Sequence, residues 1–219
     1  MTTKRVANRW LPALLAAPII WCCWSLAAGA AASAHPAKRT ATTDPRRDMI
    51  TALPAPGPHP SYGEQARLFD RFVGTWDANY AIHAVDASVT RFTGEVIFGW
   101  IIDGRALQDI WITHPKDGAA NERSIGTTVR FYDTKSGMWR VVWVYPATGT
   151  ITTLNGGAVG DRIVLRGQGS DGSLLRWSFN DIQANSFVWR GEISYNGGET
   201  WRLQGEYHMK RRPAAPATP

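Results

Sequence analysis

Apolar and polar side chains alternate along the second half of the chain. Between Met138 and Lys210, large apolar residues recur at every second position, and Arg, Ser, Thr or Gln occupy many of the positions between them. The alternation is clearest in residues 139–145, 175–179 and 187–193. Because successive side chains leave a strand on opposite sides, each of these segments is predicted to be a β-strand with one buried and one solvated face.

Ten strands of this kind are expected, with turn residues between them. Their predicted bounds are 73–85, 89–102, 105–114, 124–133, 138–145, 150–159, 162–169, 173–182, 186–195 and 200–210. Short connections such as Asp103-Gly104 and Asn196-Gly197-Gly198 favour hairpins, and no helix of useful length separates two strands, which excludes a parallel sheet. The pattern therefore predicts an all-β fold, a closed antiparallel up-and-down barrel of about ten strands, since closure removes exposed sheet edges.

One short helix is expected before the first strand. Ser61 and Glu64 have the spacing of a capping box, and Leu68, Phe69 and Phe72 can share one apolar stripe. The stripe is predicted to pack on the end of the barrel.

The beginning of the chain has the pattern of an export signal. Lys4, Arg5 and Arg9 precede an apolar run over 11–31, and Ala32-Ser33-Ala34 provides small residues for cleavage. Residues 1–34 are therefore predicted to be a signal peptide, and the protein to be periplasmic or secreted.

The alternative is an uncleaved membrane anchor, because the run approaches the roughly 20 residues that span a bilayer. Pro12 and Pro18 favour cleavage. No stable membrane insertion is expected once the signal is removed.

Removal of residues 1–34 changes the composition. Both cysteines, Cys22 and Cys23, lie in this segment, so the mature chain is expected to have no disulfide and no cysteine metal ligand. The formal charge would fall from +6 to +3, because three basic residues leave and no acidic ones. Such a balance does not indicate a polyanionic partner, and no nucleic-acid binding is predicted.

Two segments outside the barrel have the composition of unstructured chain. Residues 35–60 contain six prolines, scattered charges and no aromatic residue, and are predicted to be a disordered tether. Residues 212–219 are predicted to be a disordered tail. The barrel domain is assigned to residues 61–211.

The motif Gly74-Thr75-Trp76 opens the first predicted strand. The glycine allows a sharp turn into the barrel, and the tryptophan is large enough to fill its floor. This motif resembles the Gly-x-Trp of the calycins, the superfamily of lipocalins and fatty-acid-binding proteins. The resemblance implies that a basic residue of a late strand packs across the indole, and the candidates are Arg202, Lys210 and Arg211.

Three further stretches, residues 104–111, 128–133 and 194–201, resemble bacterial lipocalin-like domains of unknown function. This resemblance covers about residues 66–211 and implies a calycin-type fold, but it brings no established catalytic residues. The chain departs from lipocalins in its lack of disulfides and of a helix near the C-terminus. It departs from fatty-acid-binding proteins in its lack of a helical lid after the first strand.

Residues 194–201 also resemble the Asp-box hairpin of sialidases. That box recurs in each propeller blade, whereas here it occurs once, with Asn196 in the acidic position. It is therefore interpreted as a turn with a packed tryptophan.

The third and fourth predicted strands interrupt the alternation. Whichever face of the third strand is inward carries a polar group, either Asp109 or Gln108. A buried carboxylate needs a partner, and Asp109 is expected to pair with Arg105 or Arg130. The pair is interpreted as a salt bridge near the barrel mouth, as a polar anchor for the head group of a ligand, or as part of an acid and base arrangement.

His208, on the last predicted strand, is considered as a haem ligand, because barrels similar to nitrobindin hold haem iron with a histidine of a late strand. The alternation of the last strand places His208 on the polar face, so it is predicted to point to solvent unless a bulge shifts the register. The other histidines do not have the spacing of a metal site. No metal and no cofactor are predicted.

The preferred functional hypothesis is an exported barrel that binds a small apolar or aromatic molecule. The predicted ligand-binding residues are Trp76, Tyr80, Trp100, Asp109, Arg130, Trp143, Trp177 and Trp189. One alternative is an enzyme, an isomerase or hydrolase, that uses Asp109, Arg130 and Tyr132 on such a ligand. The other is a filled barrel that acts through its surface. A cavity of about 300 Å³ or more would favour a ligand over a filled barrel.

Overall fold

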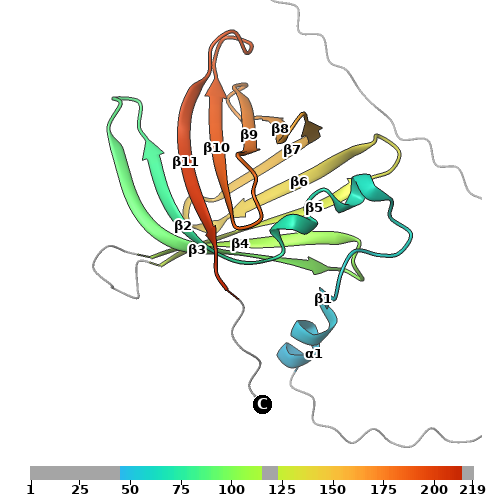
Figure 1. Ribbon diagram of the computed structural model, residues 1–219. Coiled ribbons are helices and arrows are strands. Elements are labelled where there is room, and N and C mark those ends of the chain that lie inside the picture. The colour runs from blue at the N-terminus through green and yellow to red at the C-terminus, as the bar shows by residue number, and fades with distance from the viewer. Residues whose placement is uncertain (1–44, 115–122, 214–219) are drawn as a thin grey trace, which may run out of the picture. The chain divides into compact units, whose positions relative to one another are not determined.

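Ten long antiparallel strands form a closed barrel in the computed structural model, which describes residues 45–114 and 123–213 (Figure 1). The predicted signal peptide lies outside the described residues. The strands are β2 (Gly74–His83), β3 (Val89–Ile101), β4 (Ala106–His114), β5 (Ser124–Asp133), β6 (Met138–Tyr145), β7 (Thr150–Val159), β8 (Arg162–Gln168), β9 (Leu174–Asn180), β10 (Ser186–Ser194) and β11 (Arg202–Arg211). The predicted fold class is confirmed.

Each strand of the barrel pairs with the next one in the chain, and the last strand pairs with the first. The β2–β11 register runs from Trp76 opposite Arg211 to Ile82 opposite Gly205. This pairing leaves neither β2 nor β11 with a free edge, as expected of an up-and-down barrel.

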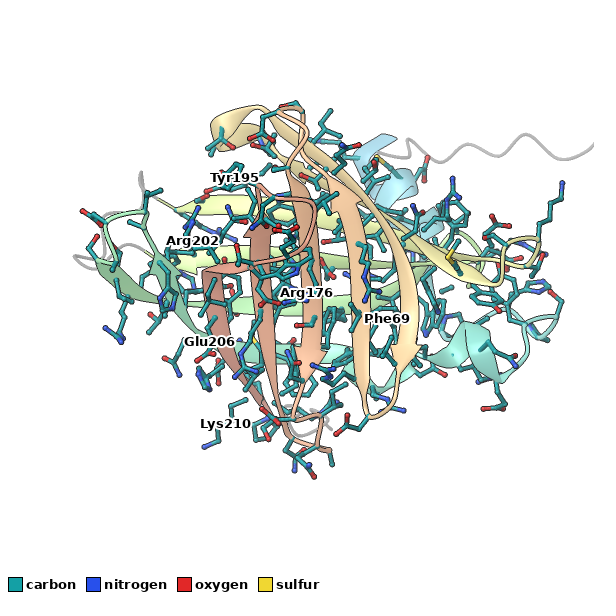
Figure 2. The ribbon with its side chains drawn as sticks, turned by 90° about the horizontal axis from the view of Figure 1, so that it is seen from above. Phe69, Arg176, Tyr195, Arg202, Glu206 and Lys210 are labelled. Atoms are coloured by element: carbon teal, nitrogen blue, oxygen red, sulfur yellow. The ribbon has the colours of Figure 1, made fainter. Side chains whose placement is uncertain are left out.

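A bulge in β11 changes the register near its start. Gly205 pairs with Gly191, but the next partner of β10 is Leu203, opposite Glu192, so Gln204 is an extra residue. Leu203 therefore lies on the face of Glu192 and not on the inner face, where simple alternation had placed it. Beyond the bulge the alternation holds, and Glu206 and Lys210 lie on the outer face of β11, where Figure 2 shows them one after the other.

A segment of two short 3₁₀ helices closes one end of the barrel, where a single helix capped by Ser61 was predicted. The helices are η1 (Glu64–Arg67) and η2 (Asp70–Phe72), and the residue before η1 makes no side-chain cap. The deeply buried side chains of this segment are Ala66, Phe69 and Phe72, which recur every three residues. A 3₁₀ helix has three residues per turn, so it directs all three side chains to the same side, into the barrel.

Three indole N–H groups hold this segment, which we call the floor. Trp76 Nε1 donates to Phe72 O at 2.7 Å, and Trp100 Nε1 donates to Asp70 Oδ1 at 2.8 Å. Trp139 Nε1 donates to Gln65 O at 3.1 Å. Each bond satisfies a buried indole and fixes the floor to a strand of the barrel.

Arg211 is the basic residue that packs across Trp76, and neither Arg202 nor Lys210 takes this place. Its Cζ lies 4.1 Å from the centroid of the indole. Its guanidinium also donates to the carbonyl oxygens of Arg71 at 2.5 Å and Val73 at 2.8 Å. The last strand therefore holds the floor from outside, in the arrangement that the calycin resemblance implies.

Part of the segment expected as a tether has regular structure. Helix α1 (Pro45–Ala52) is followed by strand β1 (Pro54–Ala55), which pairs with Trp100 and Ile101 of β3. The pairing of β2 with β3 ends at Phe98, so β1 covers the edge of β3 that β2 leaves free. Composition did not indicate this, because the pairing depends on the barrel. No helix among residues 45–114 and 123–213 is long and apolar enough to cross a bilayer.

Candidate functional site

The barrel encloses a cavity of about 350 Å³. Its wall comes from the inward positions of the strands, where the alternation places large side chains. Aromatic residues form most of this wall, and they are Tyr80, Phe92, Trp111, Trp143, Tyr145, Trp177, Phe179, Trp189 and Tyr207. A cavity of this size and composition is in the range of small-molecule sites.

Four tryptophans of the cavity wall contact one another in a closed cycle. Their centroids are 6.5 Å apart for Trp111 and Trp143, 6.3 Å for Trp143 and Trp177, 5.5 Å for Trp177 and Trp189, and 5.8 Å for Trp189 and Trp111. Each pair meets edge to face, which is a favourable geometry for aromatic rings. Tyr207 stacks on Trp189 at 4.5 Å. The rings therefore fix one another, and the cavity has a preformed aromatic wall.

Glycines provide the space into which some of these rings fold. A Cβ on Gly126 would lie 2.1 Å from Trp143, and one on Gly191 would lie 2.6 Å from Trp189. Since real Cβ atoms do not approach other heavy atoms so closely, these rings lie over their glycines. The glycines keep the rings back against the wall of the barrel and so contribute to the width of the cavity.

The two ends of the cavity differ in their access to solvent. At one end lie Ile82, Thr113, Ser124 and Tyr145, all half-buried. At the other end the cavity reaches Phe179, which packs 5.6 Å from Phe69 of the floor. Among the described residues, the first end is therefore the one more accessible to solvent, which we call the mouth, and the second end is closed by the floor.

Asp109 and Arg130 form a buried ion pair toward the closed end, and not near the mouth as expected. Asp109 is 0% exposed and Arg130 is 2% exposed. Arg130 Nη2 contacts Asp109 Oδ2, while Asp109 Oδ1 accepts from Trp111 Nε1 at 2.6 Å and from the backbone N–H of Thr128 at 3.2 Å. Both carboxylate oxygens are thus occupied, so Asp109 holds Arg130 and does not face a ligand.

The guanidinium of Arg130 is surrounded by phenyl rings. Its Cζ lies 4.6 Å from the ring centroid of Phe69, 5.7 Å from that of Phe98 and 5.8 Å from that of Phe179. Burial acts to lower the pKa of Arg130, while contact with the Asp109 carboxylate favours the charged form. Nε and Nη1 of Arg130 are buried and have no hydrogen-bond partner among the described residues.

The structure separates the predicted ligand-binding residues into two groups. Those that line the cavity are Tyr80, Arg130, Trp143, Trp177 and Trp189. Trp76 and Trp100 do not line it, because their indoles are bound to the floor, and Asp109 lies behind Arg130. Tyr132 is also absent from the lining and packs on Trp139, 6.1 Å between centroids. The grouping of Asp109, Arg130 and Tyr132 expected for an enzyme is therefore not assembled in the cavity.

Several lining residues were not predicted, notably Trp111, Tyr145 and Tyr207. Tyr145 and Tyr207 occupy the alternate positions of their strands that carry apolar side chains, and this pattern could have identified them. Trp111 has the same parity as Asp109, so it could be assigned to the interior only once the carboxylate was known to face inward.

Burial also affects the two central tyrosines of the wall. It raises the pKa of Tyr80 and of Tyr207 well above the ordinary value, with the nearby Tyr207 and Glu95 adding to the effect on Tyr80. Both phenols are therefore neutral over the physiological range and can donate or accept hydrogen bonds. They add to the few polar groups of the wall, which also include Arg130 and the hydroxyl groups of Ser124 and Thr128.

His208 lies outside this site. Its side chain is 59% exposed and lies 3.0 Å from Glu206, on the outer face of the barrel. The predicted direction of His208 is thus confirmed. Within residues 45–114 and 123–213, no three His, Cys, Asp or Glu side chains are grouped so that they could hold a metal ion.

Comparison with solved structures finds barrels of the same kind. An S-type phycobiliprotein lyase from Guillardia theta is 13% identical, with a TM-score of 0.51, over 67% of this chain and 92% of that one. The Rv2717c protein of M. tuberculosis is 15% identical, with a TM-score of 0.52, over 70% of this chain and 100% of that one. These structures are lipocalin-like, calycin-type barrels, so the fold is shared. No protein-family model matches the chain, and neither does any curated protein sequence.

Proposed function

We propose that this protein is an exported lipocalin-like barrel that binds one small apolar or aromatic molecule in its interior. The observation that carries the proposal is the cavity of about 350 Å³, which has an aromatic wall and one open end. A barrel that acts only through its surface would not need glycines that hold the rings of Trp143 and Trp189 back from the lumen. Export is supported by the pattern of residues 1–34.

A carrier is favoured over an enzyme by the chemistry of the wall. Among the described lining residues, Arg130 alone carries a charge, and its partner Asp109 has both oxygens engaged. General acid and base catalysis needs a group that can exchange a proton with the bound molecule. The wall instead offers aromatic surface and a few hydroxyl groups, which suit reversible binding.

Tryptophan fluorescence tests the proposal directly. A ligand among Trp111, Trp143, Trp177 and Trp189 should change their emission, so we expect saturable quenching by at least one member of a panel of fatty acids, retinoids and flat aromatic compounds. Native mass spectrometry of the protein purified from its own host should show a co-purifying mass. Substitution Trp143→Ala should weaken binding through lost contact.

Trp201→Phe is the matched control, because this tryptophan is outside the cavity. Its indole donates to Gly198 O at 3.0 Å and lies under Arg176, with Cζ 4.1 Å from the ring centroid. Binding should be unchanged in this variant. The absence of both quenching and a co-purifying mass would exclude the carrier and leave a barrel that acts through its surface.

A further inference from the structure

Arg130, which lines the closed end of the cavity, has buried hydrogen-bond donors without acceptors among the described residues. Arg130 has Nη2 on Asp109, but Nε and Nη1 are buried and make no hydrogen bond to any described residue. The nearby rings of Phe69, Phe98 and Phe179 offer π faces, which are weaker partners than an oxygen atom. A buried donor without an acceptor is costly, and such a group in a binding cavity indicates where a ligand or an ordered water completes the site.

The charge at this end of the cavity is already balanced. Asp109 neutralises Arg130, and no other charged side chain lines the cavity among the described residues. A ligand carboxylate bound to Arg130 would lie close to the buried Asp109 carboxylate and would lose its hydration in an apolar space. An uncharged acceptor, such as the oxygen of a ketone or an amide, would satisfy Arg130 without this repulsion.

We infer that the ligand is an uncharged, flat aromatic or conjugated molecule whose carbonyl-type oxygen accepts hydrogen bonds from Arg130 while its ring lies against the aromatic wall of the cavity. This inference rests on the proposed function and adds the polarity and orientation of the ligand: the oxygen at the closed end, the apolar part toward the mouth. Asp109 is a positioning residue in this arrangement, because it holds the guanidinium that the ligand contacts.

Three probes with the same ring system test the inference. They are 2-acetylnaphthalene, which has a neutral acceptor, 2-ethylnaphthalene, which has none, and 2-naphthoate, which is an anion at pH 7. Isothermal titration calorimetry with the full mature chain measures their dissociation constants. We expect 2-acetylnaphthalene to bind about tenfold more tightly than the other two, as a hydrogen bond to a charged donor would give.

A double variant then identifies the donor. Arg130→Met alone would leave Asp109 buried and unpaired, so it is combined with Asp109→Asn, whose amide oxygen can still accept from Trp111 and Thr128. The variant should lose the preference for 2-acetylnaphthalene over 2-ethylnaphthalene and still bind both. Arg190→Met with Glu206→Asn is the matched control, because it removes a partly exposed ion pair of 2.7 Å outside the cavity. The control should keep the preference.

Each outcome decides a different point. Equal affinity of wild-type protein for the acetyl and ethyl probes would overturn the inference, show that water or the rings satisfy Arg130, and leave the proposed function intact. Tightest binding of 2-naphthoate would overturn the assignment of a neutral ligand. A preference for 2-acetylnaphthalene that survives in the folded double variant would exclude Arg130 as the donor. If that variant does not fold, the order of the three dissociation constants on the wild-type protein decides whether the ligand is a neutral acceptor. Failure of all three probes to bind would overturn the inference, while the proposed function would still be decided by the fluorescence panel and the co-purifying mass.

Discussion

Arg211 covers the indole of Trp76 from outside while the indole N–H binds Phe72 O inside, so one tryptophan connects the last strand to the floor. Trp76 is fully buried, and Arg211 adds hydrogen bonds to two carbonyl oxygens of the same segment. The closed end of the barrel therefore depends on residues from both ends of the domain.

Substitution Trp76→Ala should destabilise the domain by roughly 3 to 5 kcal/mol, because it removes a fully buried aromatic side chain and leaves a cavity in the floor. Equilibrium unfolding in urea measures the loss. Arg211→Met should cost about 1 to 3 kcal/mol through its carbonyl bonds and its contact with the indole. The neighbouring Arg212→Met is the control, because Arg212 makes surface ion pairs with Asp77 and Glu95 and should cost at most about 1 kcal/mol. A loss below about 1 kcal/mol in Trp76→Ala would show that the floor does not depend on this residue.

Substitution Gly126→Ala should narrow the cavity. The new Cβ would lie 2.1 Å from Trp143, so the indole must move, and the expected cost is roughly 1 to 3 kcal/mol. Near-UV circular dichroism should report the changed ring packing, and affinity for flat ligands should fall. In Gly157→Ala, on β7, no heavy atom lies within 4 Å of the new Cβ, and stability should change by no more than about 1 kcal/mol. An unchanged near-UV spectrum in Gly126→Ala would contradict the role given to this glycine.

Alkaline pH should destabilise the protein through its buried tyrosines. The folded state raises the pKa of Tyr80 and Tyr207 above the unfolded value of about 10, so it retains protons that the unfolded chain releases. The stabilising effect is complete below pH 10 and is lost as the pH rises above it. Urea unfolding at several pH values should show a smaller alkaline loss in Tyr207→Phe, by about 1 kcal/mol at pH 11. Tyr195→Phe, at an exposed position, should behave like the wild type.

Haemin should not bind through His208. The imidazole lies on the outer face of β11 and contacts Glu206. It therefore points away from the aromatic wall of the cavity. Absorption spectra of the protein mixed with haemin should show no sharp Soret band that depends on this residue. A band present in the wild type and lost in His208→Ala would mean that iron is held at the surface of the barrel.

Alternation together with turn residues was sufficient to predict the strands, even for β4 and β5, whose inner faces carry the buried polar residues Asp109 and Arg130. The predicted bounds 124–133 and 138–145 agree with β5 and β6 as the structure has them. The floor was harder to predict, since Phe69 and Phe72 are three residues apart and suit either an α-helix or a 3₁₀ helix. Its geometry also depends on the indoles of Trp100 and Trp139, which come from strands far along the chain and are not part of the local pattern.

The candidate site was predictable in its residue types but not in its depth. Tyr80, Trp143, Trp177 and Trp189 line the cavity because they point inward from their strands. Trp76 points inward from β2 like Tyr80, yet its indole is bound to the floor. The lining residues differ from Trp76 in their position along the barrel axis, and this position depends on strand register. Cavity volume could not be predicted at all, because it depends on how far rings such as that of Trp143 fold back over a glycine.

The pairing of the first strand with the last also has a consequence for synthesis. Arg211 and Val73, which meet at the floor, are 138 positions apart in the chain. Synthesis places β2 early in the chain and its partner β11 last, so the folding barrel keeps an unpaired edge until nearly all of the domain is present. Contacts between such distant segments form slowly. A chaperone that shields this edge during folding would therefore favour correct closure over aggregation.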